Sequence, residues 1–365
     1  MADRFGIDGH KIHYHPQRVG QFLAAGDDWE QLKKIYPIYV EVSPNGACNH
    51  RCIFCAVDYI GYKRVMLDTE VYAKCVGEMA AGGVKSIMYA GEGEPLLHRD
   101  IAQITAITRE AGIDVAFTTN GSYVTELFID KAVPITSWIK VSINAGTPET
   151  YSQIHRTRAD HFDIVVRNLG RMIKRREQTK TDCTVGAQCL LLPENAAELK
   201  TLATICRDTG IDYLVVKPYS QHLMSNTRRY EAIDYRNFLE LERELEALST
   251  DSFSVVFRRR TMEKHISKQV AYPTCLATPF FWAYLMADGS VYSCSAYLED
   301  QRFCLGNINQ SSFAEIWEGE RRRENVRFVR EKLDIADCRR NCRMDEVNRF
   351  LTGVRGKNIP HVNFI

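Results

Sequence analysis

The sequence lacks an excess of charge of either sign, long apolar runs and low-complexity tracts. Its 47 Lys and Arg residues nearly balance 46 Asp and Glu residues, for a formal net charge of +1. Such a chain has no general attraction for nucleic acid or an anionic membrane surface. Its longest apolar stretches are strand-sized, well short of the ~20 residues that cross a bilayer. No basic region followed by an apolar core opens the chain, so no signal peptide is visible, and we predict a cytoplasmic protein.

Cysteine, in contrast, is abundant. Disulfides are rare in the cytoplasm, so 12 cysteines in such a chain need another explanation. They form a tight triplet near residue 50, a scattered middle group and a C-terminal group of five. The distribution indicates metal ligation near both ends. The middle group falls in helix and strand patterns and is predicted to consist of buried structural thiols: Cys75, Cys183, Cys189 and Cys206.

Strand-like and helix-like segments alternate from residue 37 to 219. The predicted strands are short, apolar and often β-branched: Ile38–Ser43, Ser86–Ala90, Val115–Thr119, Trp138–Asn144, Thr184–Leu190 and Tyr213–Pro218. Helical periodicity marks the segments between them: Thr69–Ala81, Asp100–Ala111, Phe162–Arg175 and Ala196–Asp208. Successive β/α units predict parallel strands joined by right-handed crossovers. Six units are too few for a closed barrel, so we predict an α/β fold with a partial (β/α)6 TIM-like barrel, whose chemistry lies at the C-terminal strand ends.

The rest of the chain is divided around this barrel. We predict an N-terminal extension (1–36), the barrel (37–219), a connecting region (220–272), a small C-terminal α+β iron–sulfur domain (273–350) and a tail (351–365). The connecting region has a predicted helix, Tyr235–Leu248, and a candidate strand, Ser254–Phe257. The C-terminal domain has a hairpin signal at Asp288-Gly289 and a helix from about Ser312 to Lys332.

The first metal-binding candidate is the cysteine triplet. Cys48, Cys52 and Cys55 are separated by three and by two residues, soon after the first predicted strand. Three thiolates this close can bind three irons of a cubane cluster and leave the fourth iron without a protein ligand. A zinc site that includes His50, or three buried thiols, are the alternatives. Zinc motifs more often combine a two-residue gap with a second ligand pair, so the spacing favours the cluster.

With Phe54 directly before its last cysteine, this triplet resembles the signature of the radical S-adenosylmethionine (SAM) superfamily. A second motif, Gly91-Glu92-Gly93-Glu94-Pro95, follows the second predicted strand and resembles the superfamily's Gly-Gly-Glu-Pro turn, with Glu92 replacing a glycine. The resemblance implies that the open iron binds the amino and carboxylate groups of SAM. It also implies that Phe54 lies near the adenine and that the turn, with Glu94 as carboxylate, hydrogen-bonds the SAM amino group.

Later strand ends resemble further SAM-contacting positions of the superfamily. Asn120 directly follows the third predicted strand, and Ser142 and Asn144 belong to the fourth. Because residues two apart on a strand point the same way, Ser142 and Asn144 would both face the barrel mouth. Arg156 is a candidate partner of the SAM carboxylate, with Arg158 as a second candidate. Ordinary polar strand ends and solvated arginines are the alternatives.

The C-terminal cysteines predict a second metal site. Cys275 and Cys294 flank the hairpin signal, which would place both thiols on neighbouring strands, and Cys338 and Cys342 follow the helix. The set resembles the extension of the SPASM and twitch branches of the superfamily. Because the full SPASM pattern has more cysteines, the resemblance implies one auxiliary 4Fe–4S cluster; a structural zinc site is the alternative. Cys304 stays open as a replacement for Cys338, a hydrogen-atom donor or a packed thiol.

The resemblance implies an enzyme that reductively cleaves SAM to a 5′-deoxyadenosyl radical and abstracts a substrate hydrogen atom. A flavodoxin- or ferredoxin-type protein would donate the electron. We predict oxidation or epimerisation of a small carbohydrate-like metabolite, and the run Arg258-Arg259-Arg260 is a candidate site for a phosphate on it. A peptide-modifying SPASM maturase is the alternative, but the segment before the first strand is short for a peptide-recognition domain. The near-neutral charge counts against an RNA-modifying enzyme.

Overall fold

The computed structural model describes residues 4–267, 271–339, 342–356 and 360–361. Its strands are β1 (Tyr39–Val42), β2 (Ser86–Tyr89), β3 (Asp114–Thr119), β4 (Trp138–Ser142), β5 (Thr184–Leu191), β6 (Tyr213–Pro218), β7 (Ser254–Phe257), β8 (Trp282–Leu285), β9 (Ser290–Tyr292) and β10 (Cys304–Asn307). Its α-helices are α1 (Pro16–Ala25), α2 (Trp29–Leu32), α3 (Thr69–Ala81), α4 (Ile101–Glu110), α5 (Pro148–His155), α6 (Asp160–Thr179), α7 (Leu199–Thr209), α8 (Leu241–Glu246), α9 (Arg259–Ser267), α10 (Thr278–Phe281), α11 (Phe313–Glu318), α12 (Glu320–Glu331) and α13 (Asp345–Gly356).

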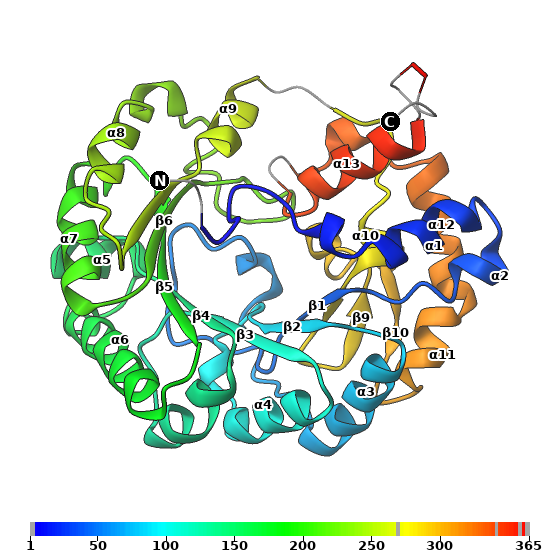
Figure 1. Ribbon diagram of the computed structural model, residues 1–365, viewed down its shortest axis with the longest axis horizontal. Coiled ribbons are helices and arrows are strands. Elements are labelled where there is room, and N and C mark those ends of the chain that lie inside the picture. The colour runs from blue at the N-terminus through cyan, green and yellow to red at the C-terminus, as the bar shows by residue number, and fades with distance from the viewer. Residues whose placement is uncertain (1–3, 268–270, 340–341, 357–359, 362–365) are drawn as a thin grey trace.

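The strands form one ten-stranded sheet in the order β10-β9-β8-β1-β2-β3-β4-β5-β6-β7. β1 to β7 are parallel, β8 pairs parallel with β1, and β9 and β10 add antiparallel strands. In Figure 1 the strands curve round a central space and the helices lie outside them. Because β7 and β10 are the two edges of the sheet, the ring is open. The fold is a partial TIM-like barrel extended at its C-terminal side by β8, β9 and β10, as predicted.

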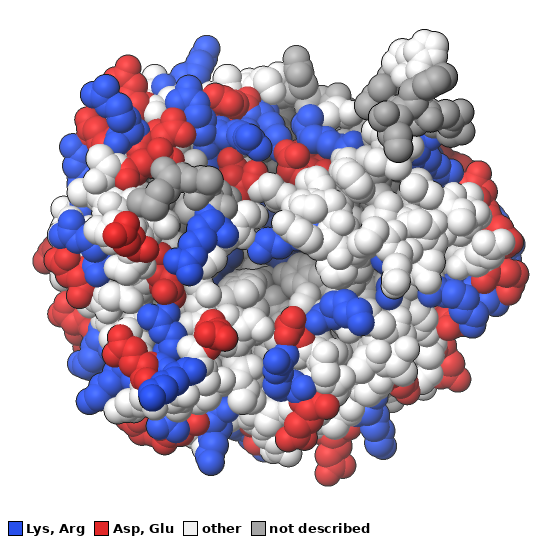
Figure 2. Space-filling view, in the orientation of Figure 1, with Lys and Arg blue, Asp and Glu red and all other residues white. Residues whose placement is uncertain are grey.

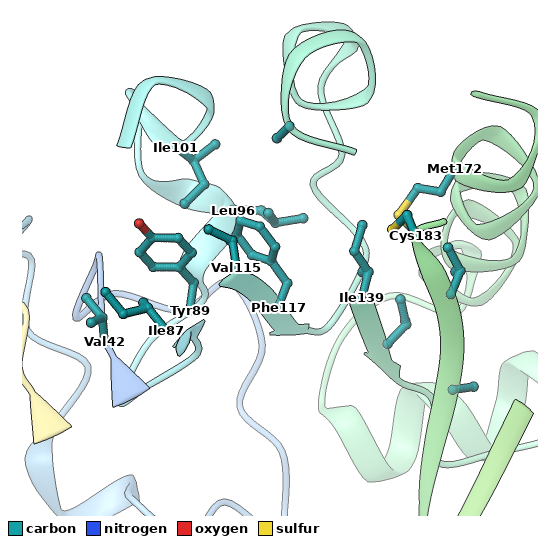
Figure 3. Packing of buried hydrophobic residues seen from close by; sticks show 14 of the residues in the cluster. Val42, Ile87, Tyr89, Leu96, Ile101, Val115, Phe117, Ile139, Met172 and Cys183 are labelled. Carbon is teal, nitrogen blue, oxygen red and sulfur yellow. The ribbon is translucent and has the colours of Figure 1, made fainter. Parts of the chain in front are cut away.

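Alternation along each strand separates the helix-covered face from the barrel interior. The outward residues pack under the helices in the main hydrophobic core, part of which is shown in Figure 3: Val42, Ile87, Tyr89, Val115, Phe117 and Ile139. The residues between them point inward. Glu41, Met88 and Lys140, for example, line a cavity on the barrel axis. The outward apolar residues thus hold the sheet against the helices, and the inward residues are free to line a binding site.

The predicted elements of the barrel are present. All six predicted strands match β1 to β6 within two residues at either end, and the helix Thr69–Ala81 is α3 itself. Gly112 and Gly210 follow helices with φ of +81° and +82°, the left-handed conformation expected there. The candidate strand Ser254–Phe257 is β7, which pairs with β6. The parallel sheet therefore continues beyond the six predicted units on both sides.

Two predicted helices are broken. The segment Tyr235–Leu248 contains a 3₁₀ turn, Tyr235–Phe238, followed by α8. The segment from Ser312 to Lys332 is divided into α11 and α12 at Gly319, whose backbone is extended. A Cβ on Gly319 would lie 2.6 Å from the carbonyl oxygen of Glu315, so the chain can turn here only because glycine lacks a side chain.

The C-terminal and N-terminal segments both join the barrel. The hairpin of β8 and β9 forms as predicted, and β8 lies directly beside β1 in the sheet. Near the N-terminus, the Phe5 ring lies 5.2 Å from that of Tyr213, and Ile7 packs on the same interior cluster. Figure 1 shows this segment crossing between the barrel and the C-terminal helices. Residues 4–11 therefore help to enclose the interior.

The domain limits stay predictions. The predicted tail begins within α13, and residues 357–359 and 362–365 of that tail lie outside the described residues, as do residues 1–3 of the predicted extension. None of the helices in the described part of the chain combines the length and hydropathy of a bilayer-spanning segment.

Candidate active site

The three cysteines of the triplet meet at one end of the barrel. Cys48, Cys52 and Cys55 lie on the loop after β1, and all three line the central cavity. Burial, with a contribution from Glu94, raises the pKa of Cys48 to about 12. Burial also raises the pKa of Cys52, and its two neighbouring thiols raise it further. Burial therefore favours the protonated thiols when no metal is bound. Metal ions bind the thiolate, so binding of a metal centre would release these protons.

A histidine that sequence reasoning missed lies beside the triplet. Nδ1 of His155, at the end of α5, is 3.3 Å from Sγ of Cys52. The backbone N–H of Asn144 donates to Nε2 of His155, at 3.3 Å, so Nε2 accepts and Nδ1 carries the proton toward the sulfur. A hydrogen bond of this kind tunes a cluster thiolate.

The zinc alternative fits these contacts less well. His50, Cys52 and His155 place ligand atoms within 4.8 Å of one another. Both ring nitrogens of His155 are engaged, however, and Nε2 of His50 lies 3.1 Å from Nδ1 of His161. The three thiols that share the cavity wall, with no fourth cysteine of the described residues on this loop, suit a cubane with an open iron.

The Gly91–Pro95 turn packs directly on the cysteine loop. The backbone N–H of Glu94 donates to the carbonyl oxygen of Ala47, at 2.9 Å. A Cβ on Gly93 would lie 2.1 Å from the carbonyl oxygen of Asn45, and Gly91 has a φ of +129°. Both glycines are therefore required for this close approach. The approach brings the two SAM-type motifs to one edge of the cavity, which Gly91, Gly93 and Glu94 line.

Replacing Gly93 with alanine is expected to weaken SAM binding by roughly 5- to 150-fold, because the new Cβ must push the turn off the cysteine loop at a cost of about 1–3 kcal/mol. Anaerobic equilibrium dialysis of SAM with reconstituted protein measures the effect. Gly77→Ala is the matched control, since Gly77 lies inside α3 with open space around its Cα. Unchanged affinity in Gly93→Ala would contradict the role of the turn.

Glu94 connects three parts of the site. Its carboxylate accepts hydrogen bonds from the Thr119 hydroxyl and from the backbone N–H groups of Leu96 and Asn120. Nδ2 of Asn120 in turn donates to Oδ1 of Asn49 on the cysteine loop, at 2.7 Å. Burial raises the pKa of Glu94 to about 7. The predicted SAM-binding residues Glu94 and Asn120 both line the cavity.

Two further predicted residues also reach the cavity. Ser142 ends β4 and lines the wall, where Nε2 of Gln188 donates to its hydroxyl at 2.7 Å. Phe54 lines the cavity with its ring edge-on to His155, at a centroid distance of 5.6 Å. Both positions suit the SAM contacts predicted for them.

Four predicted SAM-binding residues do not line the cavity. The buried Glu92 carboxylate accepts hydrogen bonds from the Tyr284 hydroxyl and the Ala287 backbone N–H, so it joins the turn to the C-terminal hairpin. Asn144 lies beyond the end of β4, and its Oδ1 accepts from the Leu190 backbone N–H. Pro95 is buried in the turn. Arg156 is exposed, at the end of α5 with a φ of +47°, and does not reach the cavity.

The four predicted auxiliary ligands converge from separate segments. Burial raises the pKa of Cys294, and the charges of Cys342 and Cys338 raise it further. Burial, and then the charge of Cys275, raise the pKa of Cys338. The expectation that Cys275 and Cys294 lie on neighbouring strands is wrong, because Cys275 precedes α10 in a loop and Cys294 follows β9. Loop residues from both segments, with Cys338 and Cys342 before α13, form the group.

Cys304 is not among the thiols whose charges act on Cys294. It begins β10 opposite Tyr292, whose hydroxyl it contacts. It is buried and does not line the central cavity, unlike Cys294 and Cys342. This position suits a packed thiol better than a hydrogen-atom donor.

The cavity, of about 750 Å³, is rich in positive charge. Seven Lys and Arg residues but four Asp and Glu residues line it. Figure 2 shows Lys and Arg side chains at the central hollow. Sequence reasoning missed Lys140 on β4 and Lys217 on β6, although a charge at an inward position of an otherwise apolar strand is an available signal.

The basic run 258–260 is divided among three environments. Arg258 lines the cavity and its Nε lies 3.0 Å from Oδ1 of Asp8. Arg259 instead pairs with Glu242 and Glu263 outside the cavity. Arg260 lines a separate hollow with Gly6 and Glu246. Only the first residue of the run is therefore placed to meet a ligand in the central cavity.

Two family models match this chain. Residues 42–204 match the Radical SAM superfamily, and residues 275–343 match SPASM, described as an iron–sulfur cluster-binding domain. GTP 3′,8-cyclase of Chlorobaculum tepidum is 27% identical over 197 residues, which are 53% of this chain and 57% of that protein, so the match spans little more than half of that relative. A probable GTP 3′,8-cyclase of Sulfurisphaera tokodaii is 24% identical over 81% of this chain and 91% of its own length.

Solved structures share the fold. The crystal structure of Streptococcus suis SuiB bound to precursor peptide SuiA superposes with a TM-score of 0.63 and 16% identity, covering 85% of this chain and 71% of SuiB. At that identity the likeness concerns the architecture alone.

Proposed function

The chain belongs to the radical SAM superfamily and carries a C-terminal SPASM iron–sulfur domain, and from this premise we propose that it oxidises or epimerises a small carbohydrate-like metabolite. The observation that carries the proposal is a single cavity of about 750 Å³ bounded by the Cys48–Cys55 triplet and by Cys294 and Cys342. Its volume is in the range of small-molecule sites. A substrate there would lie between the two proposed cluster sites.

Cys48, Cys52 and Cys55 are the residues that would hold the catalytic cluster. When bound, the cluster with SAM on its open iron supplies the 5′-deoxyadenosyl radical that takes a hydrogen atom from the substrate. His155 Nδ1–H would donate to the Cys52 sulfur and steady the ligand loop. The Gly91–Pro95 turn would present acceptors to the SAM amino group, and Phe54 and Ser142 would bound the adenosine.

The auxiliary group favours oxidation within this proposal. A carbon-centred radical on an alcohol becomes a carbonyl by losing one electron and one proton. We assign Cys275, Cys294, Cys338 and Cys342 to one auxiliary 4Fe–4S cluster, which would accept the electron, while the proton passes to solvent water. Epimerisation needs a hydrogen-atom donor instead, and Cys304 does not reach the cavity. A flavodoxin- or ferredoxin-type protein is the proposed source of the electron for SAM cleavage.

The activities named for two relatives are compatible with such a substrate. GTP, named for the cyclases of Chlorobaculum tepidum and Sulfurisphaera tokodaii, is a phosphorylated ribose compound. By analogy, we propose a phosphate-bearing, carbohydrate-like substrate for this chain.

Anaerobic protein reconstituted with iron and sulfide is expected to form 5′-deoxyadenosine when SAM and dithionite are added. Sugar phosphates or nucleotides deuterated at single carbons are then offered in turn, and mass spectrometry follows deuterium in the 5′-deoxyadenosine. The true substrate transfers deuterium to 5′-deoxyadenosine. If it is oxidised, the product is two mass units lighter than the unlabelled substrate. Samples without dithionite are the control. Deuterated peptides are offered in parallel, and label transfer from peptides alone would contradict the proposed substrate class.

A further inference from the structure

Two lysines face the cavity from alternate strands of the barrel. Lys140 is on β4 and Lys217 on β6, with β5 between them. Nζ of Lys217 donates to Oε1 of Gln188 on β5, at 2.7 Å, and Nε2 of Gln188 donates to the Ser142 hydroxyl. Nζ of Lys140 lies 5.1 Å from the centroid of the Trp138 ring. The strands thus present two ammonium groups to one space.

Three of the five other Lys and Arg residues that line the cavity have counter-charges. Arg343, Arg258 and Lys264 form ion pairs with Glu41, Asp8 and Asp345, respectively. Arg339, between two proposed auxiliary ligands, contacts Ser220. For Lys140 and Lys217, the structure of the described residues places no carboxylate within ion-pair distance. These two charges are left for a ligand.

Burial and neighbouring positive charge both act on these lysines. Burial lowers the pKa of Lys140 to about 8; Arg343 and Arg258 lower it further, and Glu41 raises it. Burial lowers the pKa of Lys217 well below its ordinary value, and Lys140 is the next contributor. Two like charges held together without a partner are costly inside a protein, because removing each from water is not repaid. A ligand that brings negative charge would reverse that balance.

We propose that Lys140 and Lys217 bind a phosphate group of the substrate on the barrel axis, with Gln188 holding Lys217 in position. The inference rests on the proposed function, because it assigns a chemical class to the substrate of that site. A phosphate monoester carries about −1.5 to −2 charges at pH 7 and therefore matches two ammonium groups, whereas a carboxylate matches one. Lysine is an established point-charge partner of phosphate.

The subsite also orients the substrate. Lys140 precedes Ser142 by two residues on the same face of β4, a separation of about 7 Å along the strand. Ser142 lies at the end of the strand where the cysteine triplet and the glycine turn meet. Lys140 therefore lies deeper in the barrel than Ser142, whereas Lys217 bonds Gln188, the register partner of Ser142. A phosphate bound by Lys140 would leave the carbon skeleton of the substrate on the SAM side of that lysine.

The test measures binding of inorganic phosphate to the reconstituted holoenzyme by equilibrium dialysis at fixed ionic strength. We expect the double variant Lys140→Met/Lys217→Met to bind phosphate at least about tenfold more weakly than the wild type. Lys200→Met is the matched control, because Lys200 pairs with Glu244 on the outer surface. Thermal melting and iron content establish that each variant is folded and loaded. Acetate, added as competitor, tests the carboxylate source.

Each result decides the inference. Weaker binding in the double variant, normal binding in Lys200→Met and poor competition by acetate support a phosphate subsite. Wild-type protein that binds no phosphate, a double variant that binds it normally, or acetate that competes as well as phosphate would overturn it. Dialysis needs no SAM cleavage, so the two proposals are tested independently. A holoenzyme that binds phosphate through these lysines but forms no 5′-deoxyadenosine would contradict the proposed function and support the subsite.

Discussion

A variant with Cys48, Cys52 and Cys55 all replaced by alanine is expected to lose about half of its iron and to form no detectable 5′-deoxyadenosine. The three thiols share one wall of the cavity, and SAM can meet an open iron only where they hold a cubane. The auxiliary thiols come from other segments, so their cluster should stay. Iron and sulfide per chain, together with 5′-deoxyadenosine formed after dithionite addition, measure the two effects separately.

The matched control replaces three thiols outside the cavity, Cys75, Cys183 and Cys206, with alanine. They are buried among helices and strands, so their loss should lower the melting temperature while both clusters and SAM cleavage remain. This separates ligand loss from general destabilisation. A triplet variant that keeps its full iron, or that still forms 5′-deoxyadenosine, would show that the catalytic cluster is bound elsewhere.

The barrel was predictable because its signals are local. Short apolar runs, often β-branched, mark β1 to β6, and the triplet and the Gly91–Pro95 turn are short motifs attached to strand ends. Their meeting in space follows from parallel strands, whose C-terminal ends share one edge of the sheet. The backbone hydrogen bond from Glu94 to Ala47 joins the two motifs directly.

The parts that sequence reasoning missed depend on long-range contacts. The local sequence predicts Glu92 as part of the SAM turn. Its carboxylate instead accepts hydrogen bonds from Tyr284 and Ala287, nearly two hundred residues later in the chain. His155 reads as one more helix residue until the end of α5 is placed against Cys52. Asn144 follows the alternation of β4 on paper, yet the strand has already ended at Ser142. In each case the tertiary partner, absent from any local pattern, decides where the side chain points.

Cys338→Ala and Cys304→Ala are expected to differ sharply, although both remove one C-terminal thiol. Cys338 lies in the group with Cys275, Cys294 and Cys342, so its loss should leave one iron of the auxiliary cluster without a thiolate and make that cluster lose iron, up to about one cluster per chain. Cys304 contacts Tyr292 on the neighbouring strand, away from the cavity, so its loss should leave iron content and SAM cleavage intact.

Iron analysis and low-temperature electron paramagnetic resonance of the reduced variants distinguish these outcomes, since the catalytic cluster supplies an internal reference in both. The consequences reach the reaction type as well. If Cys304→Ala loses about one cluster and Cys338→Ala does not, Cys304 is the fourth ligand and the grouping argued from the charges around Cys294 is wrong. If Cys304→Ala keeps both clusters and cleaves SAM but forms no product, Cys304 takes part in turnover, and epimerisation replaces oxidation as the favoured chemistry. Full product formation by Cys304→Ala leaves oxidation through the auxiliary group as the reaction that these four thiols support.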